Sequence, residues 1–224
     1  MVMGPSAETP RMRASGRLEV MDVWVDLALV RRLEATDANS AAEYVQARLA
    51  SDPQFPGAIR EVAGGMAVRS GQDSPISFAV GIGLGTPVSA EDIQEIEEFF
   101  RRASIRALFK LSPWADPGLW DILKQKGYGV GGFLNVWVLS LSDWIPPETP
   151  DDSLAIREVD RHSTEIWAKT VSIGFDGQVP TPRDIAFGLG FWESPSTTAL
   201  FGHPGRHPGG CRFGVDPRWR GDVV

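Results

Sequence analysis

The chain lacks several features that would assign it to a class of protein at once, and each shortage excludes something. Its only cysteine is Cys211, so no internal disulfide can form and a disulfide-stapled extracellular scaffold is excluded. The 22 basic residues are outnumbered by 29 acidic ones, which argues against nucleic acid or an anionic membrane surface as the partner. No group of catalytic residue types forms a strong cluster.

Long apolar runs are also missing. No segment is long enough to span a bilayer, and the first residues contain Arg11 and Arg13 but no apolar signal core. Residues 1–16 mix Pro, Gly, Ser and Arg without periodicity, which predicts a disordered leader. Together with the single cysteine, these absences predict a cytoplasmic protein.

Hydrophobic residues are present in the proportion that a folded domain needs. At 42% of 224 residues they can fill a real core, and helix-period segments alternate with strand-period segments. The pattern predicts an α/β (α+β) fold. We expect a first domain over residues 17–141, a Pro- and Asp-rich linker over 142–153, and a partial second domain with an irregular tail over 154–224.

The first domain is predicted to open with a strand over Leu18–Leu27. A helix should start at the capping box Ser40–Glu43, followed by a bent or bulged strand over Ile59–Val68, where Gly64 and Gly65 interrupt the pattern.

The most informative stretch is Ile76–Leu141. An apolar run with alternating glycines, Gly81, Gly83 and Gly85, precedes a capped helix from Ser89. That helix should bury Ile93, Ile96, Phe100 and Ala103 and leave Glu97, Glu98, Arg101 and Arg102 in solvent. A short strand ending at Leu111, a helix over Leu119–Lys126 closed by a left-handed Gly127, and a strand over Phe133–Leu141 complete the order.

The second domain begins with a predicted strand over Leu154–Val159 and a helix over His162–Ile173. Strand material at Thr197–Gly202 follows, and from His203 the chain has no usable period.

This order of elements resembles the GNAT superfamily of acetyl-CoA-dependent N-acetyltransferases, in a tandem arrangement of two domains. The resemblance rests on Ser89–Phe100, Phe109–Pro113, Leu119–Tyr128 and Asn135–Leu141, with a second opening at Ile156–Val159, Trp167 and Gly174. It implies a mixed, mostly antiparallel twisted sheet flanked by helices, and acyl transfer from acetyl-CoA to an amine of a small molecule or protein. A homodimer is also an expectation.

The family's cofactor loop is a sharper test. The resemblance implies an Arg or Gln, two residues, Gly, one residue, then Gly or Ala at a helix N-terminus, where free amides bind the pyrophosphate. Gly81–Ser89 lacks the Arg or Gln, and Pro87 removes an amide. Glu91, Asp92 and Glu95 would repel the anion. The first domain is therefore predicted to be degenerate, with weak or absent catalysis.

The corresponding loop expected in the second domain also departs from the family's pattern. Pro217–Val224 resembles its entry, but Val223 stands where Gly or Ala belongs. The family's tyrosine general acid has no counterpart, since Tyr128 lies past its helix. Residues Gly202–Asp216 can also be encoded by bases that, read one position later, spell a phosphate loop, which suggests a frameshifted tail. The alternatives are a non-catalytic module with a ligand cleft or dimer surface, or a truncated gene product.

Other patterns favour structural roles. Gly81, Gly83 and Gly85 indicate a bulged strand rather than a nucleotide loop. His203, His207 and Cys211 have helical metal-ligand spacing, but intervening prolines and glycines make a helix implausible. His162 is interpreted as a capping or surface residue. Trp120, Trp137 and Trp167 are expected in the core or between domains.

Overall fold

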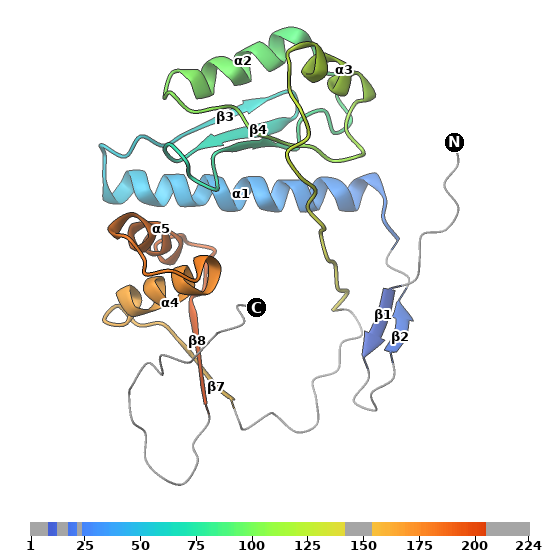
Figure 1. Ribbon diagram of the computed structural model, residues 1–224. Coiled ribbons are helices and arrows are strands. Elements are labelled where there is room, and N and C mark those ends of the chain that lie inside the picture. The colour runs from blue at the N-terminus through green and yellow to red at the C-terminus, as the bar shows by residue number, and fades with distance from the viewer. Residues whose placement is uncertain (1–8, 13–17, 22–23, 142–153, 205–224) are drawn as a thin grey trace. The chain divides into compact units, whose positions relative to one another are not determined.

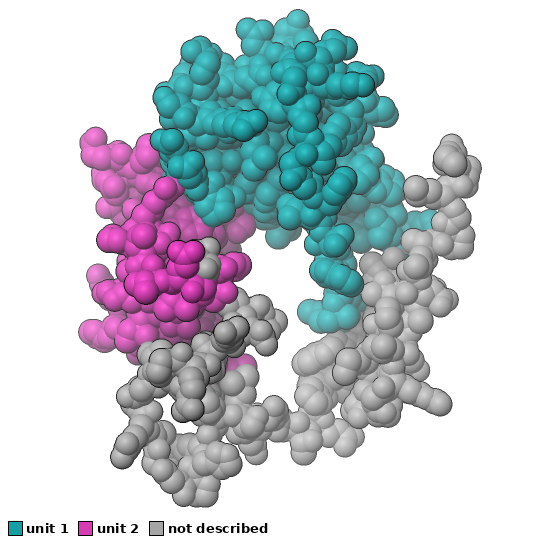
Figure 2. Space-filling view, viewed as in Figure 1, with its two compact units in different colours: residues 1–39, 59–150 teal, residues 40–58, 151–224 magenta. Residues whose placement is uncertain are grey.

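The chain has mixed α and β structure in two compact units. The computed structural model describes residues 9–12, 18–21, 24–141 and 154–204, with five helices and small, mostly antiparallel sheets in these ranges (Figure 1). Unit 1 comprises residues 1–39 and 59–150, and unit 2 comprises residues 40–58 and 151–224 (Figure 2). Residues 40–58, which the sequence assigned to the first domain, thus belong to unit 2. The predicted linker 142–153 and most of the predicted tail lie outside the described residues. No helix in the described ranges is long and apolar enough to cross a membrane.

The N-terminal part differs from expectation. Strands β1 (Thr9–Met12) and β2 (Leu18–Met21) pair antiparallel, with Thr9 opposite Met21, so part of the expected leader is a strand. The predicted strand over Leu18–Leu27 ends at Met21, and helix α1 (Leu27–Ser51) begins where that strand was expected to close.

Helix α1 passes through Ser40, so the predicted helix start there is wrong. The Ser40–Glu43 capping pattern lies inside the helix, in a stretch of weak helix formers. Burial explains why the helix continues, because Ala38, Ala41 and Val45 are all buried. Tertiary packing therefore overrides the local start signal. Residues 27–39 of α1 belong to unit 1 and residues 40–51 to unit 2.

The sheet of unit 1 has the order β3-β4-β5-β6. Its first two strands, β3 (Ala58–Val62) and β4 (Gly65–Arg69), correct the prediction of one bulged strand. Ala63 and Gly64 between them have φ of 49° and 77°, the positive values that tight hairpin turns require. Strand β5 (Phe78–Val80) runs antiparallel to β4, and β6 (Phe109–Lys110) runs parallel to β5.

Helix α2 (Ala90–Arg101) confirms the predicted capped helix. Its buried face includes Ile93, Ile96 and Phe100, as expected, whereas Ala103 lies past the end of the helix and is only partly buried. Ser89 Oγ accepts from the Asp92 N–H at 3.1 Å, and the Asp92 carboxylate accepts from the Ser89 N–H at 2.8 Å. Arg101 and Arg102 are exposed, as predicted, and both pair with Glu98, whereas Glu97, also expected in solvent, is partly buried and pairs with Lys126.

We predict that Ser89→Ala lowers the free energy of unfolding of unit 1 by about 1 kcal/mol, because the Asp92 amide loses its acceptor. Urea denaturation of the full chain measures the change. Ser89→Asp should restore most of it, since aspartate is an equally good N-cap. An unchanged midpoint for Ser89→Ala would show that the box contributes nothing.

Helix α3 (Pro117–Gln125) also confirms its prediction. Leu119 and Leu123 are buried, and Gly127 has φ of 83° with its N–H donating to the Lys124 carbonyl. Trp120, expected in the core, is instead about half exposed.

The predicted strand Phe133–Leu141 is wrong. No strand is assigned to residues 129–141, and Trp137, expected in the core, is exposed. A strand needs a neighbouring strand to receive its backbone hydrogen bonds. In the described part of the chain no strand pairs with this segment.

Unit 2 combines a two-stranded ladder with a helix pair. Strands β7 (Leu154–Glu158) and β8 (Leu200–Pro204) pair antiparallel, and α4 (Thr164–Asp176) and α5 (Pro182–Trp192) lie between them in sequence. β7 and α4 confirm their predictions, whereas α5 was not predicted. Its start is marked by a capping box from Thr181 to Asp184.

Candidate functional site

The glycine-spaced segment forms a loop, so the prediction of a bulged strand is wrong. Strand β5 ends at Val80, and Gly81, Gly83 and Gly85 follow with φ of 71°, 75° and 82°. Residues with side chains rarely adopt these values, which explains the repeated glycine. The loop joins β5 to α2, where the family resemblance places its cofactor loop.

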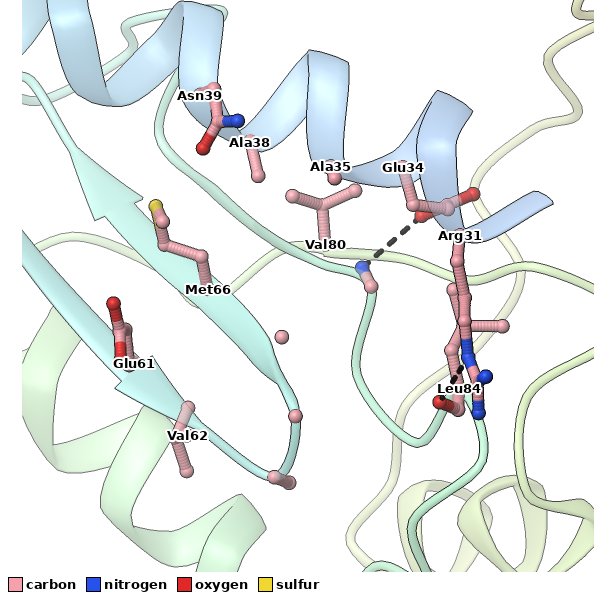
Figure 3. Close-up of a pocket in the computed structure, with 14 residues that line it drawn as sticks. Arg31, Glu34, Ala35, Ala38, Asn39, Glu61, Val62, Met66, Val80 and Leu84 are labelled. Carbon is pink, nitrogen blue, oxygen red and sulfur yellow. Dashed lines mark hydrogen bonds between the residues drawn. The ribbon is translucent and has the colours of Figure 1, made fainter. Parts of the chain in front are cut away.

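The first backbone N–H of this loop donates a hydrogen bond to a carboxylate of the chain itself. Glu34, on α1, accepts from the Gly81 N–H at 3.1 Å (Figure 3). Arg31, one helical turn earlier, donates through Nε to the Leu84 carbonyl at 3.3 Å, and its guanidinium lies where a side chain at Gly85 would be. Helix α1 therefore covers the loop with one anionic and one cationic side chain.

Asp116 holds the other end of the loop. Its Oδ2 accepts from the Val88 N–H at 2.8 Å, and its Oδ1 caps α3 by accepting from the Gly118 N–H at 3.0 Å. These two hydrogen bonds to the charged form lower the pKa of Asp116. The Gly83 N–H donates to the Ala63 carbonyl at 3.1 Å. Several of the amides that could bind a phosphate thus already have partners within the chain.

Burial perturbs Glu34, the carboxylate of α1 that accepts from the loop. Its half-buried carboxylate is deprived of water, which raises its pKa, and the nearby Asp37 raises it further. The Gly81 amide and Lys110 oppose the rise. Lys110 itself pairs with Asp37 at 2.8 Å. Glu34 has no ion-pair partner within hydrogen-bonding distance among the described residues.

A pocket of about 600 Å³ lies between α1 and the β3–β4 hairpin, with Glu34 on its wall (Figure 3). Small residues on α1, Ala35 and Ala38, leave room for it. Its charged lining consists of two carboxylates, Glu34 and Glu61, and one guanidinium, Arg31. The apolar lining includes Val62, Met66, Val80 and Leu84. The pocket can therefore hold a small molecule with a cationic end and an apolar body.

The other residues considered from sequence do not gather at this site. The Tyr128 hydroxyl donates to Glu97 at 3.2 Å, and burial together with Glu97 raises its pKa to about 12, so it is a poor general acid at neutral pH. His162 lies in the turn before α4. His203 lies in β8, while His207, Cys211 and the expected second loop at Pro217–Val224 lie outside the described residues. Within the described ranges, no three potential ligands come together to hold a metal ion.

Sequence reasoning missed Arg31, Glu34 and Asp116. Asp116 carried a usable signal, because an aspartate directly before Pro117 is a typical N-cap followed by proline at the first helical position. Arg31 and Glu34 carried none, since no helix was predicted over the residues that present them.

Comparisons with models of protein families, with curated proteins and with solved structures found no significant match.

The raised pKa of Glu34 has a measurable consequence. The folded state binds the proton of the Glu34 carboxyl more tightly than the unfolded state does. Protonated Glu34 therefore stabilises the fold at low pH, and this stabilisation is lost as pH rises through the folded pKa. We predict that Glu34→Gln removes this loss, so the variant gains stability relative to wild type as pH rises from about 4 to about 8. The glutamine oxygen can still accept the Gly81 amide.

Urea denaturation across that pH range measures the difference. Asp116→Asn should show the opposite pH dependence. The lowered pKa of Asp116 gives wild type a stabilisation that is lost as pH falls, so this variant should gain stability relative to wild type as pH falls. A stability difference between Glu34→Gln and wild type that does not vary with pH would contradict the prediction.

Proposed function

We propose that the chain is a GNAT-like protein of the acetyltransferase lineage in which unit 1 binds a small amine without transferring an acetyl group to it. The observation that carries the proposal is the half-buried Glu34 carboxylate, which lies on the wall of the pocket and takes the Gly81 amide. The order β3-β4-β5-α2-β6-α3 in unit 1 and the restart β7-α4-α5-β8 in unit 2 support a tandem GNAT-like arrangement.

Acetyl-CoA does not fit the loop of unit 1. A pyrophosphate needs several free backbone amides and a favourable helix N-terminus. Here the amides of Gly81, Gly83 and Val88 donate to partners within the chain. The first turn of α2 carries Glu91 and Asp92, which would repel the anion. The parent activity, acyl transfer from acetyl-CoA, is therefore not assigned to residues of this unit.

An amine fits the pocket better than an anion does. The two lining carboxylates outnumber the one guanidinium, and the Arg31 Nε is already bonded to the Leu84 carbonyl. A protonated amine would supply the ion-pair partner that Glu34 does not have among the described residues, while the apolar lining would cover its carbon body. Binding would also lower the pKa of Glu34, so amine affinity should rise with pH as this carboxyl ionises.

Isothermal titration calorimetry of the full chain tests the proposal with a series of alkylamines and arylalkylamines. At least one should bind to wild type and lose most of its affinity in Glu34→Gln. Glu91→Gln is the matched control, because Glu91 is exposed and does not line the pocket. Acetyl-CoA should give no heat and no thermal shift. Saturable acetyl-CoA binding, or amine binding that Glu34→Gln leaves intact, would refute the proposal.

A further inference from the structure

Arg31 and Glu34 are two opposite charges on one wall of the pocket that do not pair with each other. They lie three residues apart on α1, so their side chains leave the same face of the helix. The Arg31 Nε donates to the Leu84 carbonyl, and Glu34 accepts from the Gly81 N–H. Among the described residues neither side chain has an ion-pair partner. The loop therefore holds a guanidinium and a carboxylate as neighbours on the pocket wall.

The guanidinium of Arg31 keeps donors for a ligand. A guanidinium has several N–H groups, and among the described residues only the Leu84 carbonyl accepts from one of them. The terminal Nη2 lies where a side chain at Gly85 would be, so the missing side chain leaves room for it. The planar fork of a guanidinium matches the two oxygens of a carboxylate. Arg31 can therefore bind a carboxylate while it stays hydrogen-bonded to the loop.

A ligand that carries only an amine would leave this cation unmatched. Its ammonium, held by Glu34, would lie near the Arg31 guanidinium, and like charges repel. A carboxylate on the same ligand replaces that repulsion by an attraction, so both charges of the wall meet their complement. A ligand that carries only a carboxylate would instead meet the two lining carboxylates, Glu34 and Glu61. The lining thus favours a ligand with both charges over a ligand with either one.

The charged and apolar parts of the lining are arranged in an order that a ligand has to follow. Figure 3 shows Arg31 and Glu34 toward one end of the pocket and Met66 toward the other, with Val80 between them. Building on the proposed amine site, we propose that its ligand is an α-amino acid with an apolar side chain, bound through its ammonium to Glu34 and through its carboxylate to Arg31. An α-amino acid carries both charges at one end and its side chain at the other. An ω-amino acid has its apolar chain between the charges, which this order does not fit.

Isothermal titration calorimetry of the full chain tests the ligand class by comparing leucine with isopentylamine, the same molecule without its carboxyl group. Leucine should bind about tenfold more tightly, the gain expected of one partly exposed hydrogen bond between charged groups. Leucinamide keeps the amine and the side chain but has no negative charge, so it should bind no better than isopentylamine. The isomer ε-aminocaproate, with its charges at opposite ends, should bind more weakly than leucine. Equal affinity for leucine and either of these two molecules would overturn the proposal.

Arg31→Gln distinguishes a contact with the carboxylate from a general loss of the site. The variant should weaken leucine binding about tenfold and strengthen isopentylamine binding, because the amine loses a repelling neighbour. Damage to the loop would weaken both. Arg32→Gln is the matched control, since Arg32 is exposed on the same helix and does not line the pocket, and it should change neither affinity.

The outcomes separate this inference from the proposed function on which it rests. If isopentylamine binds in a way that depends on Glu34, but leucine has no advantage that Arg31→Gln removes, the amino acid is the wrong ligand and the amine site stands. If neither leucine nor any amine of the series binds, the amine site fails and the inference fails with it.

Discussion

Phe100→Ala is expected to lower the free energy of unfolding of unit 1 by about 3–5 kcal/mol, the range found when a buried aromatic ring is removed from a packed core. Phe100 is fully buried on the inner face of α2, beside Ile93 and Ile96, and its ring lies edge-on to that of Phe99, with centroids 5.2 Å apart. Alanine would leave a cavity that this short helix cannot close.

Hydrogen exchange of peptides from α2 and β5, followed with urea, locates the effect in unit 1. Phe175→Ala is the matched control, because Phe175 is 76% exposed on α4. That variant should change stability by less than about 0.5 kcal/mol, as surface substitutions usually do. Equal losses for the two variants would mean that the α2 face is not the core of unit 1.

The elements that could be predicted from sequence are those whose signals are local. The capping box at Ser89 and the left-handed Gly127 use hydrogen bonds within one helical turn, so the residues themselves determine them. The buried face of α2 follows from helical spacing alone. These predictions needed no knowledge of distant residues, and they hold.

The predictions that failed depend on partners far away in sequence. Ser40 has the residues of a helix start, but buried alanines on both sides of it keep α1 continuous. Phe133–Leu141 has the composition of a strand, yet strand formation requires an edge to pair with. Gly64 could mark either a bulge or a turn, and only the pairing of β3 with β4 decides for the turn.

The candidate site was only half accessible to sequence for the same reason. The loop from Gly81 to Ser89 was found, together with its lack of an Arg or Gln and its acidic neighbours. Glu34 lies 47 positions before Gly81, and no local sequence pattern predicts the hydrogen bond between them. The first amide of the loop is thus already hydrogen-bonded to a carboxylate of the chain itself.

Tyr44→Ala should lower the free energy of unfolding of unit 2 by about 3–5 kcal/mol, as Phe100→Ala should in unit 1. Tyr44 lies in the part of α1 that belongs to this unit and is nearly fully buried. Its ring is 5.3 Å from that of Phe187 and 4.9 Å from that of Phe191, both on α5. Gly190 of α5 permits the close approach, since a side chain there would meet the Tyr44 ring.

If the ring of Tyr44 stabilises unit 2 by packing, its hydroxyl group should contribute little. Among the described residues the Tyr44 hydroxyl has no hydrogen-bond partner, and burial raises its pKa, so Tyr44→Phe should keep the ring contacts and leave stability within about 0.5 kcal/mol of wild type. Hydrogen exchange of α5 should accelerate strongly in Tyr44→Ala and hardly in Tyr44→Phe. Exchange of α5 that is unaffected by Tyr44→Ala would show that unit 2 folds without residues 40–58. Strong acceleration would mean that unit 2 depends on residues 40–58, which precede the sheet of unit 1 in the sequence, and that unit 2 does not fold alone when the chain is cut at residues 142–153.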